Sequence, residues 1–74
     1  MPTINMPATG ANIKAMAKAK GMNAATLSAA FGFNTPQAIY KWFRGDALPT
    51  LDNLVILASL LNVTMDAIVV ISRT

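Results

Sequence analysis

Apolar residues recur at helical spacing in the first third of the chain. Within residues 10–20, Ile13, Met16 and Ala17 fall on one side of a helix, three and four positions apart. Thr9 precedes this stretch and is a residue type that caps helix N-termini. The pattern predicts a first helix over about this range, capped by Thr9, with a narrow apolar stripe facing inward.

The next stretch has the signals of a short helix with a defined start and end. Asn23 is suited to cap the helix, and Leu27 and Phe31 form its apolar face. Gly32 ends it, because glycine readily adopts the left-handed conformation that other residues avoid. A tight turn is predicted to follow.

A second short helix comes directly after this turn and carries a polar, cationic face. Thr35 is a further cap, and Pro36 suits the first helical position, where its missing N–H costs nothing. Ile39 and Trp42, three residues apart, form the buried side, and Gly45 closes the helix. The two short helices are therefore predicted to form a helix-turn-helix with Trp42 in the core.

The C-terminal half continues with two more capped helices. Thr50 and Thr64 are N-caps, and Asn62, which tolerates the left-handed conformation, separates the helices. The β-branched run at residues 69–71 fits either a frayed helix or a short strand. The predicted core stripe of the fourth helix is Leu51, Leu54, Leu57, Ala58 and Leu61.

The N-terminal stretch differs from the rest of the chain. Residues 1–8 contain two prolines and no apolar periodicity, so we expect an extended or disordered arm. Residues 9–74 then form the domain, an all-α fold of five short helices. The arm lacks the basic start and the long apolar run of a secretory signal, which favours a cytoplasmic protein.

Composition limits how so short a chain is stabilised. The 74 residues include no cysteine or histidine, which excludes disulfides and a zinc site built on these ligands. Hydrophobic residues make up 54% of the chain and the mean hydropathy is +0.47, which is high for a soluble monomer. These values favour association with a partner chain, and the net charge of +3, with a pI near 9.8, suits a polyanionic partner.

Catalytic chemistry has few residues to use. The three acidic residues are Asp46, in a loop, and Asp52 and Asp66, at helix starts where they favour the helix dipole. The sequence has no motif of paired carboxylates, of a nucleophile with a base, or of a glycine-rich phosphate loop. We therefore predict no enzymatic activity, no cofactor and no metal site. A membrane span over residues 51–71 is disfavoured, because charged and polar cap residues interrupt it.

Residues along most of the chain resemble a known family. They are Leu27, Phe31-Gly32-Phe33, Ile39, Trp42, Arg44-Gly45, Pro49-Thr50-Leu51, Leu54, Ala58 and Val63-Thr64-Met65-Asp66. Over roughly residues 10–68 the chain is similar to the Cro and phage-repressor (XRE-like) helix-turn-helix family, and residues 35–42 match a variant with a Ser/Thr-Pro-Gln-Ala-Ile/Val-Tyr-Lys-Trp recognition helix. The resemblance implies a lambda-repressor-like fold and a dimeric regulator of transcription, repressor-like, that binds double-stranded DNA. Some members of the family are antitoxins or phage-immunity switches.

The chain departs from the family pattern in three places. The interval from Gly32 to Ile39 is one residue longer than in the commonest members, and Phe43 stands where a polar residue is usual. The first helix of the motif opens with Ala24-Ala25, where many members carry a polar residue. This pair and the sparse charge favour an alternative function, a protein-interaction module such as an antitoxin. The salt dependence of binding to random duplex DNA separates the two functions, because phosphate contacts weaken steeply with salt.

The second helix of the motif supplies most of the candidate DNA contacts. Gln37 matches the adenine edge with its paired donor and acceptor, and Lys41, one turn later, reaches guanine acceptors or a phosphate. Thr35 suits a phosphate or the thymine methyl group. The alternative for each of these three residues, and for Tyr40, is an exposed polar side chain with no role. The alternative for Lys14 and Lys18 is a solvated helix face. The candidate contacts to the DNA backbone are Asn23, Tyr40, Arg44, Lys14 and Lys18.

The fourth and fifth helices carry more apolar residues than one buried helix face needs. Because a short chain cannot bury helices that are apolar nearly all round, we predict a homodimer joined through these helices and the tail. The alternative is that these residues pack against the first helix and the N-terminal arm. The predicted interface is Val55, Ile56, Leu60, Val69, Val70 and Ile71.

Overall fold

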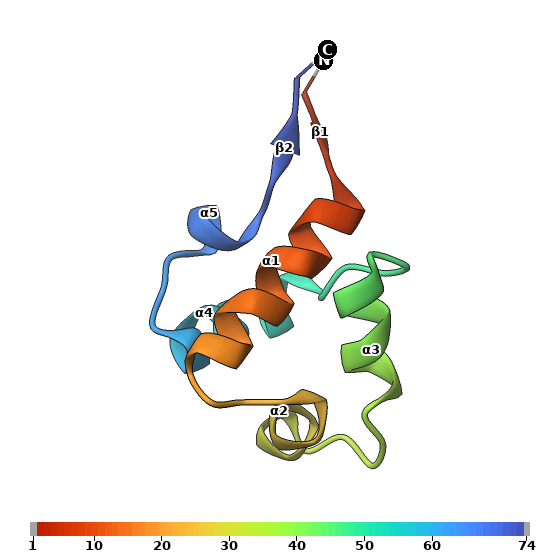
Figure 1. Ribbon diagram of the computed structural model, residues 1–74, viewed down its shortest axis with the longest axis vertical. Coiled ribbons are helices and arrows are strands. Elements are labelled where there is room, and N and C mark those ends of the chain that lie inside the picture. Colours follow the sequence, from red (N-terminus) through yellow and green to blue (C-terminus); the bar gives the residue numbers. More distant parts are fainter. Residues whose placement is uncertain (1, 74) are drawn as a thin grey trace.

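A computed structural model describes residues 2–73 as five helices and one small antiparallel sheet. The elements are β1 (Thr3–Ile4), α1 (Met6–Ala19), α2 (Ala24–Phe31), α3 (Gln37–Arg44), α4 (Leu51–Leu61), α5 (Met65–Ile68) and β2 (Ile71–Ser72). Figure 1 shows α1 crossing the middle of the molecule, with α2 below it, α3 to its right and the sheet above it. The predicted helical architecture is therefore confirmed. The predicted arm begins at residue 1 and the predicted domain ends at residue 74. These two residues lie outside the described part of the chain.

The core forms where the apolar sides of the five helices meet. The predicted inward stripe of α1 is confirmed, because Ile13 and Ala17 are buried. Trp42 is buried as well, and the rings of Phe31 and Phe33 meet it edge-on at centroid distances of 5.3 and 6.1 Å. Each helix contributes at least one of the largest fully buried hydrophobic side chains, which are Ile13, Leu27, Ile39, Leu57, Leu61 and Ile68.

The start signals predicted for α2, α4 and α5 are confirmed. The Asn23 side chain accepts a hydrogen bond from Thr26 N–H at 2.9 Å, and the Thr26 hydroxyl accepts one from Asn23 N–H, which together form a capping box. Thr50 and Thr64 cap α4 and α5 with one hydrogen bond each. In both caps the threonine hydroxyl accepts a hydrogen bond from the backbone N–H three residues later. Gly32 ends α2 in the left-handed conformation, with φ of 73°.

The prediction for the start of the first helix is wrong. α1 includes residues 6–8, and the Asn5 side chain caps it by accepting a hydrogen bond from Ala8 N–H at 3.0 Å. Pro7 does not interrupt the helix, because proline is tolerated in the first turn, where its N–H would have no helical partner. Part of the predicted arm is therefore helical, and the predicted cap Thr9 is buried inside the helix.

The C-terminal tail forms a strand, which decides between the two structures that its sequence allowed. β2 pairs antiparallel with β1, with Ile71 opposite Ile4. Asn5 N–H donates to Val70 O at 2.8 Å, and the Thr9 hydroxyl accepts a hydrogen bond from Val70 N–H at 2.9 Å. The start of α1 is thus bonded to the residue that precedes β2.

The buried side of α4 differs from the predicted stripe at one end. Leu57, Ala58 and Leu61 are buried as predicted, whereas Leu51 is 72% exposed. Leu51 is the first residue of α4, where a side chain leans toward the preceding loop, and it lines a surface hollow with Leu48 and Pro49. Leu60, one of the residues predicted for the dimer interface, is half-buried and packs against the core.

The third helix starts one residue later than predicted. Pro36 occupies the N-cap position with no side-chain hydrogen bond, and Gln37 is the first helical residue. Thr35 contributes its carbonyl oxygen instead, which accepts a hydrogen bond from the Ser28 hydroxyl at 2.9 Å. Ser28 is buried in α2, so this bond ties the longer turn to the preceding helix and uses the residue that we expected to be the cap.

Candidate nucleic-acid interface

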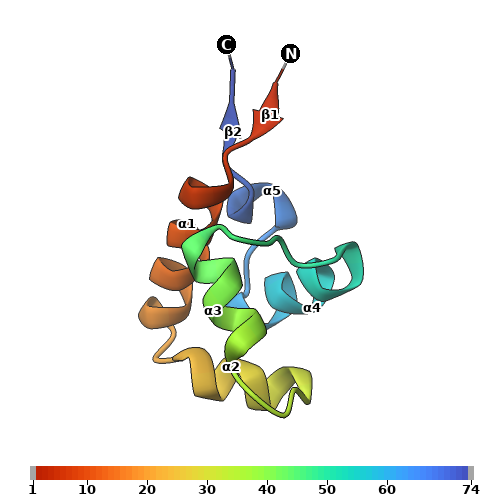
Figure 2. The same ribbon diagram turned by 90° about the vertical axis from the view of Figure 1, so that its right-hand side faces the viewer.

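α3 has one side packed into the core and the other side on the surface. Figure 2 shows α3 in front, with α1 to its left and α2 beneath it. Its C-terminal end approaches α1 closely at Gly10, where an added β-carbon would lie 2.7 Å from Phe43 O. Ile39 and Trp42 fix its buried side. The exposed residues of α3 are Gln37, Tyr40, Lys41 and Arg44.

The three residues predicted to contact bases lie together on α3 and the turn before it. Thr35, Gln37 and Lys41 line an open hollow of about 480 Å³, which we call the base-reading hollow. A recognition helix presents its N-terminal residues to base edges in the major groove, so this is where such contacts are expected. The other residues that line it are Gly32, Phe33, Asn34 and Ala38.

The five residues predicted to contact the DNA backbone also share one depression. It has a volume of about 570 Å³ and lies between α1, the start of α2 and α3; we call it the basic groove. Three cationic side chains line it, Lys14 and Lys18 from α1 and Arg44 from α3. Its remaining residues are Met22, Asn23, Ala24, Tyr40 and Phe43.

A third, smaller hollow joins the two depressions along α3. It has a volume of about 270 Å³ and is lined by Gln37, Tyr40, Lys41 and Arg44. Gln37 and Lys41 also line the base-reading hollow, whereas Tyr40 and Arg44 also line the basic groove. The candidate base contacts and backbone contacts therefore form one continuous surface.

Asn23 has two roles at the rim of the basic groove. Its side-chain oxygen accepts the capping hydrogen bond from Thr26 N–H, so its amide nitrogen is the atom available to a phosphate. The first N–H groups of a helix have no partner inside the helix and carry partial positive charge. The start of α2 at Ala24 therefore adds to the positive potential of the groove.

One cation of the groove is paired with an acidic side chain. Arg44 Nε donates to Asp46 Oδ2 at 2.8 Å, and both side chains are more than half exposed. Within residues 2–73, Lys14, Lys18 and Lys41 form no ion pair. The surface around α3 thus carries three uncommitted positive charges and one that is shared with a carboxylate.

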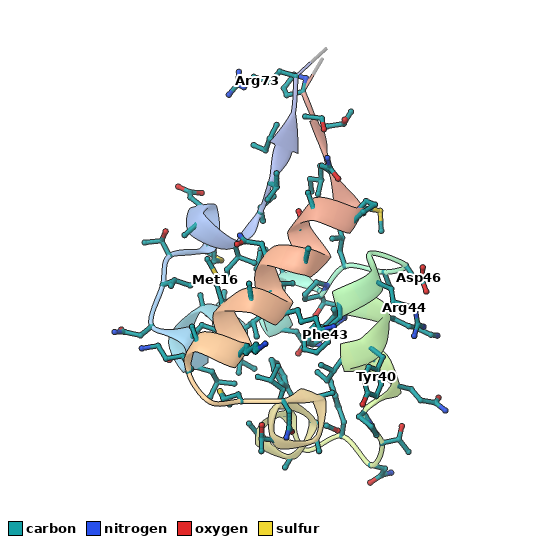
Figure 3. All side chains as sticks on the ribbon, viewed as in Figure 1. Met16, Tyr40, Phe43, Arg44, Asp46 and Arg73 are labelled. Carbon is teal, nitrogen blue, oxygen red and sulfur yellow. The ribbon has the colours of Figure 1, made fainter. Side chains whose placement is uncertain are left out.

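Sequence reasoning missed several residues that complete these depressions. Asn34 lies in the turn that is one residue longer than usual, and that extra length was the signal for it. Phe43 lies between α1 and α3 in Figure 3, and its ring meets that of Tyr40 edge-on, with the ring centroids 6.4 Å apart. Its departure from the family pattern was the available signal. Met22 and Ala24 flank Asn23, one of the predicted backbone contacts, but their apolar side chains gave no signal of a contact with DNA.

The surface has no feature of a metal centre or a membrane segment in the described part of the chain. Nowhere in residues 2–73 do three potential metal ligands of the histidine, cysteine, aspartate or glutamate types come together. Over the same range, the helices are too short or too polar to cross a bilayer.

Comparisons with known proteins agree with the helix-turn-helix fold. A family model described as Helix-turn-helix matches residues 13–68. The structure is similar to the crystal structure of the restriction-modification controller protein C.AhdI from Aeromonas hydrophila, with a TM-score of 0.76 and 22% sequence identity, over 86% of this chain and 96% of that chain. At this identity the similarity shows a shared fold. No curated protein sequence matches the chain.

Proposed function

The chain belongs to the Cro/C1-type (XRE-like) helix-turn-helix family of DNA-binding transcription regulators, and from this we propose that it represses transcription as a homodimer bound to a specific DNA site. The observation that supports this best is the continuous surface around α3. All eight residues selected as DNA contacts, three for bases and five for the backbone, line it.

In the proposed complex, α3 enters the major groove with its N-terminal end toward the bases. Gln37, in the first turn, pairs with an adenine edge, and Lys41 reaches a guanine or a phosphate one turn later. Ala38 also lines the base-reading hollow, and its methyl group suits contact with a thymine methyl. The basic groove then receives the neighbouring sugar-phosphate backbone, which fixes the register of α3 without reading sequence.

Binding to duplex DNA at several salt concentrations tests the proposal. Lys14, Lys18 and Arg44 are three cations that the groove offers to phosphates. Because Arg44 shares its charge with Asp46, two to three neutralised phosphates give a slope of log K against log salt of roughly −2 to −3 for each protomer. Binding that does not weaken with salt, or no binding at all, would contradict the proposal and favour the alternative of a protein-interaction module.

Two lysines of α1 and its C-cap make a matched pair of variants. Lys18 lines the basic groove, whereas Lys20 is exposed and does not line it. Lys18→Ala should reduce the magnitude of the salt slope by about 0.9 per protomer, and Lys20→Ala, with the same change in charge, should leave it nearly unchanged. Equal effects of the two variants would mean that net charge, and not the groove, sets the affinity.

The proposed homodimer uses an apolar strip on another part of the surface. Ile4 and Leu51 line one hollow of about 150 Å³, Ile71 pairs opposite Ile4, and Val55 follows Leu51 by one helical turn. We call these four exposed residues the apolar strip. A contiguous apolar surface on a small protein favours association. Of the residues predicted for the interface, Val55, Ile56 and Ile71 are exposed, whereas Leu60, Val69 and Val70 are partly buried within the chain.

A two-fold dimer makes a prediction about the DNA site. Each protomer presents one α3, so a footprint should show two related half-sites about 10 bp apart, centre to centre. A single asymmetric region of protection would contradict the dimer while leaving DNA binding by the monomer intact. Selection of binding sites from a random library would identify the preferred sequence.

A further inference from the structure

We propose that Asp46 limits the affinity of this protein for DNA by competing with phosphate for Arg44. The proposal rests on the proposed DNA-binding function and assigns a role to a residue outside the predicted contacts. Figure 3 shows Arg44 and Asp46 together at the C-terminal end of α3, on the outer side of the helix.

Arg44 holds a central position in the proposed interface. It lines both the basic groove and the hollow that joins this groove to the base-reading hollow. Its Nε donates to Asp46 Oδ2 at 2.8 Å, with the two side chains 59% and 57% exposed. One of its donors is therefore occupied by a carboxylate at the place where the phosphate backbone is expected.

The backbone holds Asp46 in place independently of the ion pair. Gly45 ends α3 in the left-handed conformation, with φ of 78°, and Asp46 N–H then donates to Lys41 O at 2.9 Å. This helix cap fixes the backbone of Asp46 two residues after Arg44, which keeps its carboxylate within reach of the Arg44 side chain. A phosphate that binds Arg44 must displace this carboxylate or remain close to it, and like charges at such distances repel each other.

The other acidic residues are placed differently. Asp52 and Asp66 lie in the first turns of α4 and α5, where they complement the helix dipoles, and neither lines the surface around α3. Asp46 is therefore the carboxylate that opposes DNA binding locally. Because phosphate contacts carry no sequence information, its effect should be the same for every DNA sequence.

Asp46→Asn and Asp52→Asn form a matched pair for the test. Each variant changes the formal net charge from +3 to +4, with six basic and two acidic residues. Both aspartates are exposed, and thermal unfolding of each variant checks that it is folded. Affinity for a random-sequence duplex is measured by fluorescence anisotropy between about 50 and 200 mM salt, the range over which phosphate contacts lose most of their affinity.

Asp46→Asn should bind the duplex about two- to fivefold more tightly than the natural chain, the range expected for releasing an exposed ion pair. Its salt slope should also become steeper, by up to about 0.9 per protomer, since Arg44 gains a full phosphate contact. Asp52→Asn should change the affinity by much less. In an Arg44→Ala background, Asp46→Asn should have no more effect than Asp52→Asn.

The outcomes separate this inference from the proposed function. If the natural chain binds DNA in a salt-dependent way but the two variants behave alike, the competition is refuted and the function stands. If Asp46→Asn weakens binding instead of tightening it, Asp46 positions Arg44 for its phosphate, and the inference is refuted. If the natural chain does not bind DNA, both proposals fail together. An effect of Asp46→Asn that persists without Arg44 would show that Asp46 acts on the phosphate by charge alone, which also refutes competition for Arg44.

Discussion

Substitution of Gly10 by alanine should displace the recognition helix, because α1 and α3 touch through their backbones at this residue. A β-carbon at Gly10 would overlap the carbonyl oxygen of Trp42 and would lie 2.7 Å from Phe43 O and 2.9 Å from Gly45 N. All three atoms belong to the backbone at the end of α3. No side chain can rotate to make room, so α3 itself must move away from α1.

The expected loss of stability follows from two opposing terms. In a helix interior, alanine is favoured over glycine by about 1 kcal/mol. Overpacking of a dense contact costs about 1–3 kcal/mol, and backbone obstacles place Gly10→Ala near the upper end, so the net loss is about 2 kcal/mol. For a domain of this size the melting temperature should fall by about 8–16 °C.

Thermal unfolding followed by circular dichroism measures this loss. Ala11→Gly is the matched control, because Ala11 is the next residue of α1 and is exposed, so its substitution reports helix propensity without a clash. Below both melting temperatures, Gly10→Ala should also bind DNA more weakly than the control at an equal folded fraction. If Gly10→Ala melted at or above the temperature of the natural chain, α3 would not meet α1 at Gly10, and the geometry of the basic groove would be wrong.

The remaining predictions concern base recognition and association. Gln37→Ala should relax the base preference at one position of each half-site, by about 1–3 kcal/mol, and an unchanged profile in site selection would transfer that role to Thr35 or Lys41. Ile71→Asp should give a folded monomer in sedimentation, because Ile71 is half exposed and belongs to the apolar strip. Met65 is also an exposed apolar residue but lies outside the strip, so Met65→Asp should leave the dimer intact. A dimer that survived Ile71→Asp would place the interface elsewhere.

The parts of the fold that were predicted correctly depend on neighbours in sequence. Asn23 and Gly32 set the ends of α2 through hydrogen bonds and backbone angles within a few residues, so their effect is visible in the sequence. The start of α1 was mispredicted because Pro7 is compatible both with an irregular arm and with a first helical turn. The strand at the tail depends on Thr9 and Val70, which are 61 residues apart and whose contact no local pattern indicates.

In the candidate site, too, the features set by near neighbours in sequence were predicted, and those set by contacts between distant helices were not. The helical spacing of Gln37 and Lys41 predicts that they share a face, and they line one hollow. Lys14 and Lys18 lie across the basic groove from Arg44 because α1 and α3 approach each other closely. The glycine at position 10 permits this close approach, and the spacing of residues along the sequence does not reveal it. The pairing of Arg44 with Asp46 required the geometry of the helix cap, because two exposed residues of opposite charge near each other in sequence often do not pair.

The first two turns of α1 connect the two proposed functional surfaces. Asn5 and Thr9 hold Val70, and with it the strand that carries Ile71 of the apolar strip. On the other side of the same turns, an added β-carbon at Gly45 would lie 2.6 Å from the Pro7 Cα, so the end of α3 rests on the backbone of α1. Backbone contacts of this kind cannot lengthen without breaking hydrogen bonds or opening the core. In the proposed dimer, the distance between the two recognition helices is therefore set by α1, through the segment whose sequence suggested only an arm.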